Sequence, residues 1–171
     1  AKLGIYVIVD WHILRDGNPN IHADKAEYFF RKMCPLFKDY DNVIYEICNE
    51  PNTEGTWAEV TRYANRIIPV IREADPGKII IVGTPVWSQR VDEAAKAPLS
   101  YPNLVYTLHF YADTHKDDLR NLMVNAIKDG LPVFVSEFGI LDDESTFIST
   151  EHFNVPDVSV ISFPSNGQLF T

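Results

Sequence analysis

The class of fold follows from the stretch Ile44-Tyr45-Glu46-Ile47-Cys48-Asn49-Glu50-Pro51. Its first part is apolar and β-branched, as in a strand covered on both faces, and it stops at a glutamate. A second run of this kind lies further along the chain, Val133-Phe134-Val135-Ser136-Glu137-Phe138-Gly139. A glutamate at the end of a buried strand is costly unless another group satisfies it or chemistry uses it. We therefore expect Glu50 and Glu137 to lie together on one face of a sheet.

Strand-like and helix-like segments alternate along the chain. Strands are expected at residues 4–9, 43–48, 78–82, 104–108 and 132–136. Helices are expected at 24–37, between the capping box that begins at Thr56 and the stop at 75–77, at 91–97 and at 117–128. Strands that alternate with helices in this way predict a parallel α/β sheet.

Helical spacing of apolar residues predicts which faces are buried. In the helix after Thr56 these residues are Trp57, Val60, Ala64, Ile67, Ile68 and Ile71. In the helix at 24–37 the residues expected to face the core are Tyr28, Phe29, Met33, Leu36 and Phe37.

Polar side chains gather where the expected strands end. They are His12, Asn49 and Glu50, His109 and Tyr111, and Glu137. In barrels and open parallel sheets alike, ligands bind at the carboxyl ends of the strands. Two carboxylates at that edge point to glycoside hydrolysis. The alternative for the two glutamates is that they cap helix N-termini.

Composition limits the classes of function. With 171 residues, 46% of them hydrophobic, the chain can bury a core without disulfide or metal staples. The net charge of −9 argues against nucleic-acid and anionic-membrane partners. No CxxC or HExxH motif and no apolar stretch near ~18 residues occurs, so we expect no metal, no cofactor and no membrane span. Cys34 and Cys48 are expected to be buried and unbridged.

The two ends of the chain differ from its middle. The sequence enters a strand directly after Ala1-Lys2-Leu3-Gly4 and has no signal peptide, which is typical of an excised piece. Residues 1–143 are expected to form the catalytic domain. Residues 144–171 lose the helical period and form an irregular tail with one possible strand at 158–163.

Five segments in order carry a family resemblance: Tyr6-Val7-Ile8-Val9-Asp10-Trp11-His12, Ile44-Tyr45-Glu46 with Asn49-Glu50-Pro51, Gly83-Thr84 with Trp87-Ser88-Gln89, Leu108-His109-Phe110-Tyr111 and Val135-Ser136-Glu137-Phe138-Gly139. Together they resemble the bacterial endo-β-1,4-glucanase (cellulase) branch of glycoside hydrolase family 5. The resemblance covers roughly residues 4–141 and implies a (β/α) barrel.

The resemblance also implies that the barrel is incomplete. The five expected strands match the third to the seventh strand of the family's eight. The first two β/α units, with an arginine near the nucleophile, and the eighth strand, with a tryptophan, have no counterpart here. The chain is thus expected to be either a fragment of a longer enzyme or a shortened variant with a rebuilt end.

The family pattern implies roles for individual residues. By resemblance Glu50 is the general acid/base and Glu137 the nucleophile of a retaining double displacement. Substrate-contacting or site-lining roles fall to His12, Asn49, Trp87, His109 and Tyr111, with Trp87 alternatively a packing residue. Glu46 receives no catalytic role.

Two functions remain open from the sequence. The first is an active, secreted endo-β-1,4-glucanase acting on cellulose or a related β-glucan. The second is a weakly active or inactive remnant that binds β-glucan. An incomplete barrel leaves two unpaired apolar edges, at 4–9 and 132–136, so a homo-oligomer that covers them is expected.

Overall fold

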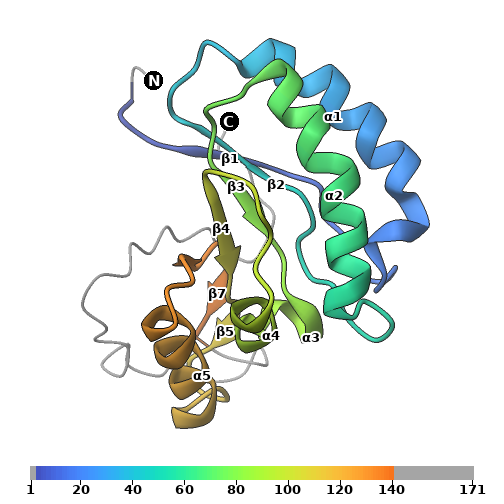
Figure 1. Ribbon diagram of the computed structural model, residues 1–171. Coiled ribbons are helices and arrows are strands. Elements are labelled where there is room, and N and C mark those ends of the chain that lie inside the picture. The colour runs from blue at the N-terminus through green and yellow to red at the C-terminus, as the bar shows by residue number, and fades with distance from the viewer. Residues whose placement is uncertain (1–2, 141–171) are drawn as a thin grey trace.

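Five parallel strands form the central sheet, in the order β1-β2-β3-β4-β6 (Figure 1). The computed structural model describes residues 3–140, so the tail expected at 144–171 and its possible strand lie outside the described residues. The strands of this sheet are β1 (Val7–Asp10), β2 (Val43–Glu46), β3 (Ile80–Val82), β4 (Leu104–Thr107) and β6 (Val133–Phe134). Each is parallel to its neighbour, so their carboxyl ends meet at one edge. The predicted α/β class and its five parallel strands are confirmed.

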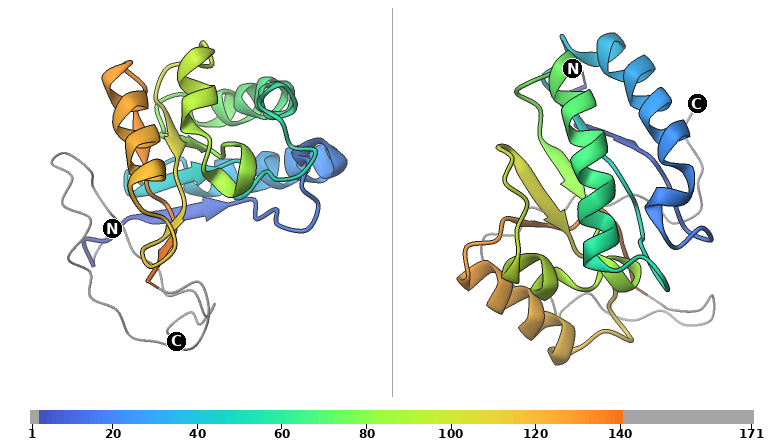
Figure 2. Two further views of the ribbon diagram at one scale, coloured as in Figure 1. Left: turned by 90° about the horizontal axis from the view of Figure 1, so that it is seen from below. Right: turned by 45° about the vertical axis from the view of Figure 1, so that its right-hand side comes forward.

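The helices connect successive strands and pack on the sheet. The two long ones, α1 (Ala23–Phe37) and α2 (Trp57–Ala74), lie side by side (Figures 1 and 2). The others are α4 (Val91–Lys96) and α5 (Asp117–Lys128), with single helical turns at η1 (Pro19–His22) and α3 (Pro85–Ser88). The Thr56 hydroxyl caps α2 by accepting a hydrogen bond from the Glu59 backbone N–H at 3.4 Å.

The core lies between the sheet and these helices. All six residues predicted to face inward from α2 are buried. The largest fully buried side chains include Tyr45, Tyr63, Tyr106, Phe30 and Ile47. Cys34 and Cys48 are buried and free, as predicted.

The inward face predicted for α1 was wrong in part. Tyr28 and Leu36 are each 65% exposed, whereas Phe30 and Cys34 are fully buried. The buried stripe runs through Ala23, Ala26, Phe30 and Cys34, and this order has the i, i+3, i+4 spacing of one helix face. The helix carries a second apolar stripe, and hydrophobicity alone does not decide which stripe meets the sheet.

The strands predicted at 104–108 and 132–136 are found as β4 and β6, and each is followed by a further short strand that was not predicted. Beyond the main sheet, β5 (Phe110–Tyr111) pairs in parallel with β7 (Phe138–Gly139). The Phe110 and Phe138 rings stack there with centroids 5.4 Å apart. The second small sheet therefore holds together the segments that follow β4 and β6.

The β1 side of the sheet carries exposed apolar residues. Ile5, Tyr6 and Val7 are 56, 55 and 43% exposed. In the order of the described sheet, β1 has a neighbour only on its β2 side. None of the helices within residues 3–140 is long and apolar enough to cross a membrane.

Candidate active site

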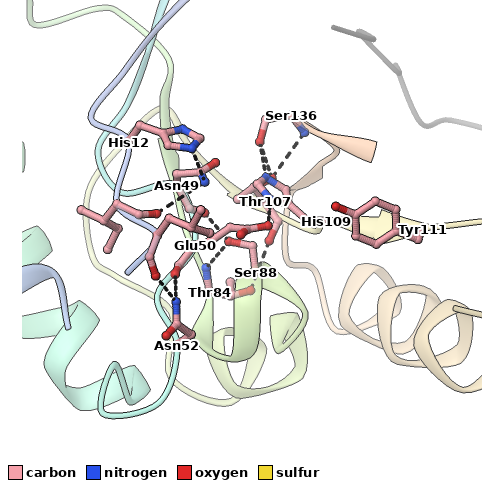
Figure 3. A network of polar contacts seen from close by, with 12 residues as sticks. His12, Asn49, Glu50, Asn52, Thr84, Ser88, Thr107, His109, Tyr111 and Ser136 are labelled. Carbon is pink, nitrogen blue, oxygen red and sulfur yellow. Dashed lines mark hydrogen bonds and ion pairs between the residues drawn. The ribbon is translucent and has the colours of Figure 1, made fainter. Parts of the chain in front are cut away.

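Side chains from four strand ends converge at the carboxyl edge of the sheet (Figure 3). His12 follows β1, Asn49 and Glu50 follow β2, His109 follows β4, and Glu137 follows β6. Oxygen atoms of Glu50 and Glu137 and a ring nitrogen of His109 all lie within 4.8 Å of one another. The structure thus brings together the two glutamates that the sequence singled out, and neither is a helix cap.

A pocket opens over these groups. It is lined by Glu50, His109, Phe110, Tyr111, Glu137, Phe138 and Gly139. A neighbouring pocket shares Glu50, His109 and Tyr111 and extends the site to Trp87 and Leu14. The two pockets meet at Glu50 and His109, which line both of them, and we refer to them together as the cleft.

Asn49, next to Glu50, is held firmly by its neighbours. Its side chain is buried, and its Nδ2 lies 3.3 Å from His12 Nε2 and 3.5 Å from the Ile13 carbonyl oxygen. The Ser88 hydroxyl donates to the Asn49 carbonyl at 2.6 Å. These contacts fix the backbone immediately before Glu50.

His12 stands at the end of β1 and faces the acidic groups. Its Nδ1 lies 2.8 Å from Asp10 Oδ2. This hydrogen bond is the main reason that the pKa of His12 is raised, and the charges of Asp10, Glu137 and Glu50 add to it while burial opposes it. His12 thus contacts Asn49, the residue before Glu50, and its role in substrate contact stays a prediction.

Trp87 projects from a strained turn. Val86, Trp87 and Ser88 have positive φ angles of 57°, 54° and 56°. For residues other than glycine this conformation costs roughly 1–2 kcal/mol each. The turn is held by the Trp87 N–H, which donates to the Pro51 carbonyl at 3.0 Å, and by the Ser88 carbonyl, which accepts from the His109 N–H at 2.8 Å.

This turn places the aromatic side chain of Trp87 at the cleft. Trp87 is 44% exposed and lines the same pocket as Glu50. The sequence predicted a loop here, and the left-handed geometry was not predictable because it depends on contacts with Pro51 and His109.

Tyr111 closes the other side of the pocket. It is 38% exposed and lines the pocket together with Glu137. Its backbone N–H donates to His115 Nδ1 at 2.8 Å, which anchors the segment after β5. Five of the seven predicted site residues, Glu50, Trp87, His109, Tyr111 and Glu137, therefore line the two pockets, whereas Asn49 and His12 lie beside them.

The sequence analysis missed a layer of polar residues beneath the cleft. Ser136 and Thr107 are buried, with their hydroxyl oxygens 2.6 Å apart. Ser136 Oγ also donates to Glu46 Oε1 at 2.8 Å and lies 2.9 Å from His109 Nε2. Glu46, which received no role, is thus connected to the site. A carboxylate inside an otherwise apolar strand was the available signal.

Burial raises the pKa of Glu46 well above its ordinary range, and the nearby charge of Asp10 raises it further. The hydrogen bond from Ser136 opposes this effect, whereas the charges of Glu137 and Glu50 add to it. Glu46 is only 4% exposed. The nearest basic group is the His109 ring, whose Nε2 lies 3.9 Å from Glu46 Oε1. Because burial disfavours the charged form of a carboxyl group, Glu46 is expected to hold a proton.

Glu50, His109 and Glu137 are also groups of the kind that bind metals. Their arrangement equally provides two carboxylates and an imidazole for acid–base chemistry. The expectation that the chain needs no metal and no cofactor stays a prediction.

An α/β sheet with paired glutamates at its carboxyl edge has the form of a glycosidase site. The family model for cellulase, glycosyl hydrolase family 5, matches residues 1–155. The chain belongs to this family. Its five strands are the incomplete (β/α) barrel that the resemblance implied.

Known proteins resemble the chain closely. An endoglucanase of Clostridium saccharobutylicum is 53% identical over 141 residues, which are 82% of this chain and 32% of that protein. The structure of cellulase Cel5C_n aligns with a TM-score of 0.78 and 56% identity, covering 80% of this chain and 43% of the other. The catalytic domain of Thermobifida fusca endoglucanase Cel5A, in complex with cellotetraose, aligns with a TM-score of 0.75 and 43% identity, over 80% and 46% of the chains. The chain spans about a third of the length of the curated relatives.

Proposed function

We propose that this chain carries the catalytic pair of a retaining endo-β-1,4-glucanase, with Glu50 as general acid/base and Glu137 as nucleophile. The observation that carries the proposal is the approach of the two carboxylates, whose oxygens lie within 4.8 Å of each other. Retaining glycosidases hold their carboxyl groups ~5–5.5 Å apart, whereas inverting ones leave ~6.5–9.5 Å for a water. The short separation favours retention.

In the first step, an oxygen of Glu137 attacks the anomeric carbon. The bond from that carbon to the glycosidic oxygen breaks, and Glu50 transfers its proton to the departing oxygen. The products are a glycosyl ester on Glu137, a free sugar hydroxyl and an ionised Glu50.

In the second step, a water takes the place of the departed sugar. Glu50 removes a proton from this water as its oxygen attacks the anomeric carbon, and the ester bond to Glu137 breaks. Two inversions at one carbon restore the original configuration, and both glutamates return to their starting forms.

The remaining cleft residues suit substrate positioning. Asn49, held by His12 and Ser88, would donate to the sugar 2-hydroxyl in the transition state. The exposed face of Trp87 would stack on a sugar ring beyond the cleaved bond. Tyr111 lies beside Glu137, where its phenol would hold the nucleophile in place.

The substrate class proposed is a β-1,4-linked glucan such as cellulose. The names of the relatives, which are endoglucanases, support it, as does the complex of a structural neighbour with cellotetraose. Such a polymer lies outside the cell, so we also propose that the protein acts as a secreted enzyme.

The test assigns the two roles separately. Reducing-sugar release from carboxymethyl cellulose should be abolished by Glu137→Gln and by Glu50→Gln, and unchanged by the control Glu54→Gln, since Glu54 is exposed. On a dinitrophenyl β-cellobioside, whose leaving group needs no acid, Glu50→Gln should still release a burst of phenolate. Glu137→Gln should release none.

Azide tests the assignment independently. Added to Glu50→Ala, it should give a β-configured glycosyl azide, because it replaces the water without requiring a base. An α-configured azide, or equal activity of wild type and Glu137→Gln, would refute the proposal. If wild type and Glu137→Gln release equally negligible amounts of reducing sugar but both still bind glucan, the chain is instead a remnant that binds without cutting.

A further inference from the structure

One hydroxyl group beneath the cleft has three polar neighbours. Ser136 Oγ lies 2.8 Å from Glu46 Oε1, 2.9 Å from His109 Nε2 and 2.6 Å from Thr107 Oγ1 (Figure 3 shows Ser136, Thr107 and His109). Ser136 is buried, so water does not share these bonds freely. A hydroxyl carries one proton and can accept two hydrogen bonds. The direction of each bond is therefore constrained by the others.

Ser136 uses its single hydroxyl proton in a hydrogen bond to Glu46. A carboxyl oxygen that bears no proton can only accept, so Ser136 donates to Glu46 Oε1. Ser136 Oγ then accepts from its two other neighbours, Thr107 and His109. His109 must consequently carry a proton on Nε2.

This assignment determines what His109 offers to Glu50. A neutral imidazole with its proton on Nε2 has a lone pair on Nδ1. His109 Nδ1 lies 3.0 Å from Glu50 Oε1. The contact is a hydrogen bond only if Glu50 is the donor, which requires the protonated, acid form of Glu50.

The proton expected on Glu46 also has a nearby acceptor. Asp10 and Glu46 are register partners on the neighbouring strands β1 and β2. Asp10 Oδ1 is buried and has no hydrogen-bond partner among the described residues. A proton on the second oxygen of Glu46 could satisfy that orphan acceptor and would leave Oε1 free to accept from Ser136.

We propose that Glu46 and Ser136 are positioning residues that hold His109 in its Nε2–H form, so that His109 Nδ1 accepts the proton of the acid Glu50. This inference rests on the proposed role of Glu50. It adds a buried relay, from Asp10 to Glu50, that sets the protonation state in which catalysis begins.

The relay also affects the second half of the reaction. After Glu50 has given its proton to the leaving group, its carboxylate faces the Nδ1 lone pair of His109. Two groups with lone pairs at hydrogen-bond distance repel each other, which favours removal of a proton from the attacking water. The Nε2–H form therefore supports both the acid and the base step.

Several titratable groups face this relay. Asp10 comes from the end of β1, Glu50 from the segment after β2, His109 from the segment after β4, and Glu137 from the segment after β6. Burial is the main reason that the pKa of Glu46 is raised, and the charges of Asp10, Glu137 and Glu50 raise it further.

Nitrogen-15 NMR of the histidine-labelled full chain tests the inference directly. The wild type should show His109 protonated on Nε2 and unprotonated on Nδ1. Glu46→Gln should keep this form, because an amide oxygen still accepts from Ser136. Glu46→Leu removes the acceptor, so Ser136 is free to donate to His109, and the signal should shift to the Nδ1–H form.

Ser136→Ala provides a second variant should Glu46→Leu fail to fold, and it should give a mixture of the two forms. Asp75→Asn is the matched control, because Asp75 is a buried carboxylate paired with Lys78 at 3.7 Å. It should leave His109 unchanged. An Nδ1–H form in the wild type, or an unaltered Nε2–H form in folded Glu46→Leu or Ser136→Ala, would overturn the inference.

Activity gives a second readout. In Glu46→Leu, the alkaline limb of the pH–rate profile should move down by about one pH unit, equal to a ~10-fold loss above the limb. Because NMR reports the form of His109 without turnover, an inactive chain with the expected signals would contradict only the proposed function. If the chain is active but the protonated ring nitrogen of His109 does not change in the Glu46 and Ser136 variants, only the relay would be contradicted.

Discussion

A single methyl group added at Gly83 is expected to disturb the candidate site from below. Gly83 follows β3, and the backbone on both sides of Glu50 passes close to it. A Cβ atom at this position would lie 2.1 Å from the Cys48 carbonyl oxygen and 2.8 Å from Pro51 Cδ. Both neighbours are parts of the chain that flank Glu50, so they cannot swing away as a flexible side chain would.

The size of the effect follows from these distances. Contacts of a Cβ below 3.0 Å are essentially never seen, so the segment around Cys48 must retreat by about 1 Å. Overpacking of this kind costs ~1–3 kcal/mol of unfolding free energy. A displacement of ~1 Å in a catalytic group can reduce turnover by ~10²-fold.

Gly83→Ala should therefore lose both stability in urea unfolding and activity on a soluble cellulose derivative. Gly77→Ala is the matched control, because a Cβ at Gly77 meets nothing within 4 Å. If the two variants unfold at the same urea concentration and hydrolyse equally fast, the close approach is not what positions Glu50.

Three further outcomes are expected. Tyr63→Phe should cost ~1–3 kcal/mol in urea unfolding, because it leaves the buried Ile47 carbonyl without the 2.6 Å bond from Tyr63; unchanged stability would contradict this. The hydrogen bond to Asp10 raises the pKa of His12 above 6.5, so its stabilisation is present below that pH and lost as pH rises through the folded value; His12→Gln should flatten this fall in stability above pH 6.5. The chain should self-associate through the exposed β1 edge, and Val7→Lys should shift light scattering towards monomer; a wild-type monomer would refute it.

Local signals predicted some elements well. Helix α5 has the predicted bounds of 117–128, because its apolar period is clear and Gly130 and Pro132 end it. Helix α2 begins after Thr56, as the capping box indicated. Strand bounds were less accurate. The strand predicted at 132–136 pairs with β4 only at Val133–Phe134, since the chain beyond it follows the second, smaller sheet.

The sequence by itself determined that Glu50 and Glu137 would share an edge, because the carboxyl ends of parallel strands all lie at the same edge of the sheet. Only the tertiary structure decided what lies beneath them. Glu46 lies on β2 and Ser136 follows β6, two strands that are not neighbours in the sheet, yet their side chains meet at 2.8 Å in the buried interior. A bond between residues 90 positions apart leaves no local pattern in the sequence, since its geometry belongs to the packed sheet and to no single strand.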